Sequence, residues 1–106
     1  MELTKEEKSL LLYMETQAVD YGGKLQSVRM NADDFDVAKR WNESGFVLFG
    51  RIAANDHVTR GSSGKYLCTH WCVLSDEAWE AAHTERRARC QRLMDKLTVR
   101  RIGLAA

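Results

Sequence analysis

The first helical pattern in the chain follows Thr4, and apolar residues then recur every three or four positions. Thr4 and Glu7 have the Ser/Thr-x-x-Glu spacing of a capping box, which marks a helix N-terminus. We predict a helix over residues 5–20. Gly22 and Gly23 follow it, and glycine supplies the left-handed backbone of a helix C-cap.

A second helix is predicted over residues 32–44. Asn31 is a favourable N-cap, the first turns are acidic, and an apolar stripe continues to Trp41. Gly45 closes this helix. Residues 24–30 alternate only imperfectly between apolar and polar, so this stretch fits either a short strand or one distorted helical turn.

Aromatic and branched residues then predict two strands, at residues 46–53 and 65–74, joined by a polar, glycine-containing stretch. We interpret them as an antiparallel hairpin, or wing. Alternation predicts the two core-facing sets, which are Phe46, Leu48, Gly50 and Ile52 on the first strand and Leu67, Thr69, Trp71 and Val73 on the second.

A last helix is predicted over residues 76–98, and a seam runs along it at alternating spacings of four and three. The seam consists of Trp79, His83, Arg86, Cys90, Leu93 and Leu97. Such a helix reaches about 35 Å at 1.5 Å per residue, longer than so small a domain can cover. We therefore expect Trp79, His83, Cys90, Leu93 and Leu97 to form an interface with a second copy. The predicted class is α+β and mostly helical, in a single domain over residues 1–106.

Composition narrows the class of protein. The chain has 106 residues, of which 44% are apolar and 29% charged, so wholesale disorder and a fibrous repeat do not fit. No apolar run approaches the roughly 18 residues of a membrane helix, and the N-terminus is polar. We expect a cytoplasmic protein whose three cysteines are reduced.

Charge is divided unevenly along the chain. The net charge of +1 excludes a uniformly basic nucleic-acid binder, but residues 1–56 carry −3 and residues 57–106 carry +4. Residues 86–101 contain seven positive side chains and one negative. An acidic partner docking there and a solvated helix C-terminus both explain this segment.

The sequence offers little for a metal, a cofactor or catalysis. Cys68, His70 and Cys72 share one strand face, in steps of about 6.6 Å that do not converge on one ion, so half-buried small residues are the better interpretation. Cys90 is interpreted as a small apolar seam residue. His57, in the loop, is interpreted as simply exposed, and no phosphate loop or nucleophile elbow occurs. We predict no enzyme activity, metal or cofactor.

The tryptophans Trp41, Trp71 and Trp79 are interpreted as core or interface anchors. Two segments around the first two carry a resemblance, residues 41–47 with the sequence WNESGFV and residues 71–78 with WCVLSDEA. They resemble the recognition-helix end and the step from wing to C-terminal helix of MarR-like winged helix-turn-helix domains. The resemblance covers about residues 30–85. It implies a winged-helix fold, binding to double-stranded DNA and a homodimeric transcriptional regulator.

On this resemblance, residues 32–44 are the recognition helix, and residues 61–64 form a loop that approaches the phosphates. The implied DNA-binding residues are Arg29, Lys39, Arg40, Arg51, Arg60 and Lys65.

Three aspartates, Asp33, Asp34 and Asp36, open that helix and should repel a phosphate backbone. The alternative is therefore a winged-helix protein-interaction module, such as an adaptor or a phage or mobile-element inhibitor of a host factor. Its contact surface would be these aspartates or the basic last helix. Asn42 fits an adenine reader, a surface residue or a C-terminal cap equally well.

Overall fold

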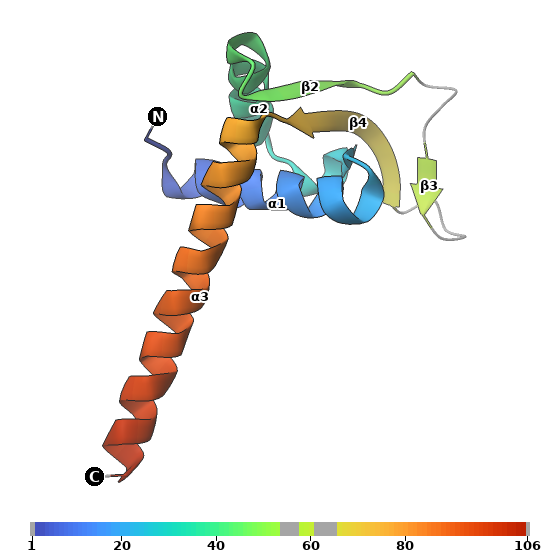
Figure 1. Cartoon of the computed structure of the whole chain (residues 1–106). Coiled ribbons are helices and arrows are strands. Elements are labelled where there is room, and N and C mark those ends of the chain that lie inside the picture. The colour runs from blue at the N-terminus through green and yellow to red at the C-terminus, as the bar shows by residue number, and fades with distance from the viewer. Residues whose placement is uncertain (1, 54–57, 61–65, 106) are drawn as a thin grey trace.

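The computed structural model describes residues 2–53, 58–60 and 66–105, and it describes side chains for residues 2–53 and 68–98. The architecture is α+β, with one four-stranded antiparallel sheet (Figure 1). The elements in chain order are α1 (Lys5–Tyr21), β1 (Lys24–Gln26), the short 3-10 helix η1 (Ser27–Arg29), α2 (Ala32–Ser44), β2 (Val47–Arg51), β3 (Val58–Arg60), β4 (Tyr66–Leu74) and α3 (Asp76–Ala105).

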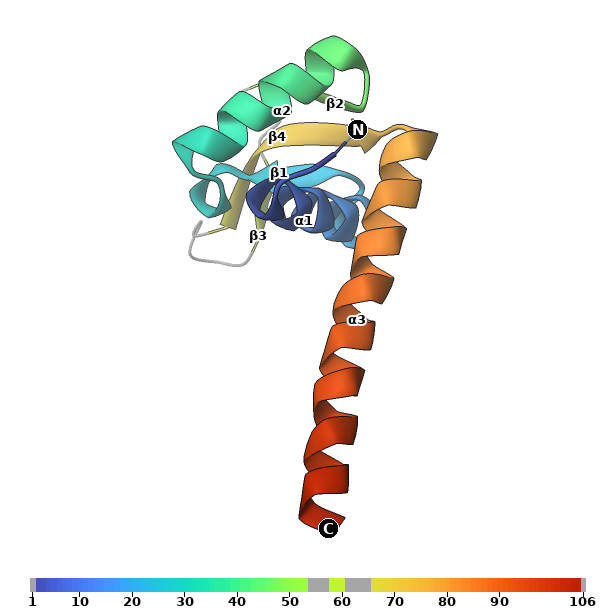
Figure 2. The same cartoon turned by 90° about the vertical axis from the view of Figure 1, so that its left-hand side faces the viewer.

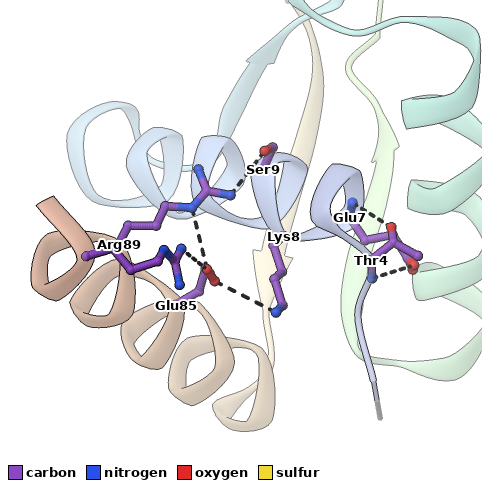
Figure 3. Close-up of polar contacts among 7 residues, drawn as sticks. Thr4, Glu7, Lys8, Ser9, Glu85 and Arg89 are labelled. Atoms are coloured by element: carbon purple, nitrogen blue, oxygen red, sulfur yellow. Dashed lines mark hydrogen bonds and ion pairs between the residues drawn. The ribbon is translucent and has the colours of Figure 1, made fainter. Parts of the chain in front are cut away.

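The helix ends follow the local sequence signals. Thr4 Oγ1 accepts a hydrogen bond from the Glu7 backbone N–H, and the Glu7 carboxylate accepts one from the Thr4 N–H, both at 3.1 Å (Figure 3). The expected capping box of α1 is therefore confirmed. Gly22 and Gly45 follow α1 and α2 with φ of 64° and 80°, the left-handed backbone that favours glycine.

Strand β4 is the centre of the sheet. Its C-terminal half pairs with β2, from Val47 opposite Leu74 to Arg51 opposite His70. Strand β1 pairs with β4 as well, and β3 pairs with the first residues of β4. Residues 24–30, which the sequence left open, thus form both a short strand and a 3-10 turn, and β1 and β3 widen the predicted two-stranded wing.

The predicted core faces of the hairpin are wrong except at Phe46, which is buried as expected. Val47 and Cys72 are buried, whereas Leu48 and Val73 are 45% and 55% exposed. Both faces of these strands carry apolar residues, so alternation alone does not choose between them, and a shift of one residue inverts the assignment. The packing of α1 and α2 against the sheet decides which face is buried. The buried core consists of Leu10, Leu11, Met14, Leu25, Met30, Ala38, Trp41, Phe46, Val47, Cys72, Leu74, Ala78 and Ala82.

Among the side chains that the structure describes, those of helix α3 that contact the rest of the domain lie in its N-terminal half. Ala78 and Ala82 are fully buried and Glu85 nearly so, and small side chains let α3 approach α1 closely. The helix continues to Ala105, beyond the predicted end at residue 98. In two views at right angles, its C-terminal half extends away from every other element (Figures 1 and 2). The molecule is accordingly elongated, at 61 × 37 × 23 Å.

Among the residues that the structure describes, none of the helices combines the length and the apolar character needed to cross a membrane.

Candidate nucleic-acid interface

Helix α2 presents one face to the core and one to solvent. Ala38 and Trp41 are buried, and the Trp41 ring meets Phe46 edge to face at a centroid distance of 5.3 Å. This anchoring fixes which residues point outward. The polar and charged residues of α2 that are exposed are Asp33, Asp36, Lys39, Arg40, Asn42, Glu43 and Ser44.

The acidic N-terminus of α2 is partly used inside the protein. Asn31 Oδ1 accepts a hydrogen bond from the Asp34 N–H at 2.8 Å, and Asp34 Oδ2 accepts one from the Asn31 N–H at 3.1 Å. The predicted N-cap is therefore confirmed, and Asp34 is the half-buried member of the cluster. Asp33 and Asp36 remain exposed.

The other end of α2 is tied to the sheet through Asn42. Its Oδ1 accepts a hydrogen bond from the Phe49 backbone N–H at 2.9 Å, which joins α2 to β2. This bond occupies the amide oxygen that adenine recognition would require. Asn42 is exposed, as expected for a surface residue, and its bond to β2 is a structural role that none of the three alternatives included.

Four of the proposed DNA-binding residues have described side chains, and all four are exposed: Arg29, Lys39, Arg40 and Arg51. They come from η1, α2 and β2. Arg29 Nε donates to Gln26 Oε1 at 3.0 Å, which holds the arginine against the strand that precedes it. Arg40 lies 3.7 Å from a Glu7 carboxylate oxygen, a surface ion pair that costs little to open.

The remaining residues belong to the wing, by which we mean β2, β3 and β4. Arg60 is the last residue of β3, opposite Tyr66 in the register, and its side chain lies outside the described part. Lys65, residues 61–64 and His57 also lie outside the described residues.

An aromatic cluster beside the wing was missed by the sequence analysis. His70 stacks on Phe49 with ring centroids 5.2 Å apart and planes 3° apart, and Phe35 meets both rings edge to face. Thr69 Oγ1 lies 2.8 Å from His70 Nδ1. The sequence shows aromatic residues at positions 35 and 49, but the contact between their rings depends on how α2 packs across β2.

The two cysteines beside His70 are structural in character. Cys68 and Cys72 are both buried, and burial raises the pKa of the Cys72 thiol to about 12. Within the described part of the chain, no three His, Cys, Asp or Glu residues are grouped as a metal site would need.

The basic segment of α3 is partly neutralised by a buried carboxylate that sequence reasoning also missed. Glu85 accepts a hydrogen bond from Arg92 Nη2 at 3.0 Å and lies 3.6 Å from Arg89 and 3.9 Å from Lys8 (Figure 3). The hydrogen bond from Arg92 is the largest influence that lowers the Glu85 pKa, followed by the nearby positive charges. Arg86 is likewise paired with Glu15 of α1.

The predicted dimer seam lies outside the contact between α3 and α1. Ala78, Ala82 and Glu85 are the buried residues of α3, and Trp79, His83 and Arg86 each follow one of them by one position, about 100° around the helix. Trp79, His83, Cys90, Leu93 and Leu97 are all exposed. The structure thus leaves the seam open, apart from the ion pair of Arg86.

Comparison of the chain with protein-family models, with curated proteins and with solved structures gave no match, so the assignment of function rests on the residues and the geometry.

Proposed function

We propose that this protein is a winged-helix domain that binds double-stranded DNA through α2 and the wing, as a transcriptional regulator. The observation that supports this proposal is the order in which α2, the strands and α3 are connected. Through Gly45 and Phe46, α2 leads directly into β2, and β2 pairs with the strand that runs into α3. A helix joined in this way to an antiparallel hairpin and a C-terminal helix is the arrangement that the sequence resemblance implies.

Helix and wing also form one rigid unit, which a DNA-reading surface needs. The Asn42 bond to Phe49 fixes α2 on β2. Ser75 Oγ donates to the Phe46 carbonyl at 2.6 Å and accepts from the Ala78 N–H at 3.1 Å, which fixes the start of α3 at the same place. Positioning by rigid elements keeps several phosphate contacts in register at once.

The charges favour a particular approach to the duplex. Lys39 and Arg40 lie in the C-terminal half of α2, and Arg51 lies at the far end of β2. Asp33 and Asp36 lie at the N-terminal end of α2 and would repel phosphate. We therefore place the DNA along the middle of α2 and the wing, away from the first turn of α2.

The experiment compares two double variants that each remove two exposed cations. Lys39→Ala with Arg40→Ala should weaken binding about equally on all duplex sequences, and the salt slope should fall by about one unit for each phosphate contact that the substitutions remove. The matched control, Arg87→Ala with Lys96→Ala on α3, should bind as the parent protein does. Equal weakening in both variants would indicate nonspecific attraction and would contradict this interface.

A protein-interaction module is the second candidate, and one observation favours it. The sheet face turned away from the core exposes Leu48, Trp71 and Val73, with Leu48 directly opposite Val73. A contiguous apolar patch is a common feature of protein contact sites.

Charge reversal separates the two candidates. Asp33→Lys with Asp36→Lys should strengthen DNA binding if α2 faces DNA. If the acidic end of α2 binds a protein, the same variant should lose that partner in a pull-down. Recovery of a stable protein complex that retains no nucleic acid would decide for the second candidate.

A further inference from the structure

The spacing of the exposed seam of α3 is compatible with an antiparallel second copy. Seam positions pair about a midpoint near residue 88, so that residue 79 matches 97, 83 matches 93, and 86 matches 90. A helix with such a seam can pack against an antiparallel copy of itself and place each seam residue opposite another. In a two-fold symmetric interface the same surface is used by both chains.

The acidic and basic residues of α3 lie in separate segments, and this separation favours an antiparallel partner. Its N-terminal turns carry the exposed acidic residues Asp76, Glu77 and Glu80, whereas residues 86–101 carry seven positive side chains and one negative. An antiparallel copy brings the acidic segment of each helix alongside the basic segment of the other. A parallel copy would instead place the two basic segments side by side, which like-charge repulsion disfavours.

An open groove lies beside Trp79 on the exposed side of α3. Trp79 is 37% exposed and borders an open groove of about 750 Å³, whose other lining residues are Glu15, Glu80, His83 and Thr84. On the projecting half of α3, Leu93 and Leu97 are 62% and 53% exposed. The groove thus combines an apolar ring with the exposed carboxylate of Glu80, since that of Glu15 is paired with Arg86, and the projecting half of α3 combines leucines with basic residues.

From these observations we infer that α3 pairs antiparallel with α3 of a second copy, and that Leu97 of the second copy packs on Trp79. His83 then lies opposite Leu93 of the second copy, and Arg86 lies opposite Cys90 of the second copy. The pairing buries the exposed leucines of the projecting half at the acidic groove of the other chain. This inference does not rest on the proposed DNA binding, because self-association can be measured with the protein alone.

The first test is the oligomeric state by sedimentation equilibrium. The parent chain should be a dimer, and Leu97→Asp should weaken self-association by at least about tenfold, since the symmetric interface contains each substitution twice. Thr98→Asp adds the same charge at the adjacent exposed position off the seam and should leave the dimer intact. Because both positions lie on the projecting half of α3, circular dichroism should show both variants folded.

Cross-linking tests the direction and register. In a Cys90→Ser background, chains with His83→Cys are mixed with chains carrying Leu93→Cys and then mildly oxidised. Antiparallel pairing predicts a disulfide between the two different chains, because disulfides need Cα atoms within about 7 Å. Disulfides between identical chains, a monomeric parent protein, or a dimer unaffected by Leu97→Asp would each overturn the inference.

Discussion

The carboxylate of Asp34 and the backbone N–H of Asn31 are 3.1 Å apart, and they form half of a reciprocal cap at the start of α2. This contact changes how the acidic cluster is interpreted. Asp34 stabilises the helix from inside the protein, so two carboxylates rather than three face any approaching duplex. The acidic N-terminus of α2 is thus explained in part by folding and only in part by surface charge.

Asn31→Ala should destabilise the protein by about 1 kcal/mol, because it removes the acceptor for the Asp34 N–H at the helix start. Urea denaturation followed by circular dichroism measures the change in the free energy of unfolding. Asp33→Ala, a change at an exposed neighbour, should stay within about 0.5 kcal/mol. Equal effects of the two variants would show that the cap contributes nothing particular.

Gly50→Ala should destabilise the sheet by about 1 to 3 kcal/mol. A Cβ at position 50 would collide with the six-membered ring of Trp71 on the neighbouring strand, so the indole must move. In a Trp71→Ala background the same glycine substitution should cost much less, and a double-mutant cycle measures this coupling. Additive effects of the two substitutions would contradict the close packing of Trp71 over Gly50.

Thiol reactivity should separate Cys90 from the other two cysteines. Cys90 is exposed, whereas Cys68 and Cys72 are buried and the pKa of Cys72 is raised to about 12, which leaves almost no thiolate near neutral pH. At dilutions where α3 is unpaired, a thiol reagent should modify one cysteine per native chain, and it should modify all three after unfolding. Cys90→Ser should abolish the fast reaction, and a fast phase that persists would contradict the burial of the other two.

Glu85 should make stability depend on acid pH. Its pKa is lowered in the folded chain, first by the hydrogen bond from Arg92, so the folded chain binds fewer protons than the unfolded chain just below the ordinary pKa. The stability that this pKa shift contributes is therefore present above the ordinary pKa, and it is lost as the pH falls through the lowered pKa. Denaturation curves between about pH 7 and about pH 3 should show a flatter acid limb for Glu85→Gln. An acid limb that is unchanged in Glu85→Gln would contradict this role of the Arg92 contact.

Local signals were enough to predict α1, α2 and the start of α3, but not the end of α3 or the turn η1. Capping at Thr4 and Asn31 and left-handed glycines at helix ends are interactions between near neighbours in sequence. The hairpin face could not be predicted in this way, since Leu48 and Val73 are as apolar as the buried residues beside them. The choice of face was made by α1 and α2, which lie far away in the sequence.

For the candidate interface, too, some features could be predicted from the local sequence, whereas others depend on tertiary packing. The exposure of Lys39 and Arg40 follows from helix periodicity once Trp41 is placed in the core. The use of the Asn42 amide by β2 and the burial of Glu85 among basic side chains depend on tertiary packing. The i,i+4 spacing of Glu85 and Arg89 is a local signal for one of the ion pairs of Glu85, whereas no residue pattern near Asn42 indicates its contact with Phe49.

The most direct test of DNA binding is a salt titration of the parent protein on mixed-sequence duplex DNA, followed by fluorescence anisotropy. The proposal predicts binding that strengthens as salt is lowered, with a slope of roughly −3 to −4 in log affinity against log salt if the four exposed cations each contact a phosphate. Undetectable binding at low ionic strength, where counterion release contributes most, would contradict DNA binding as the function of this domain.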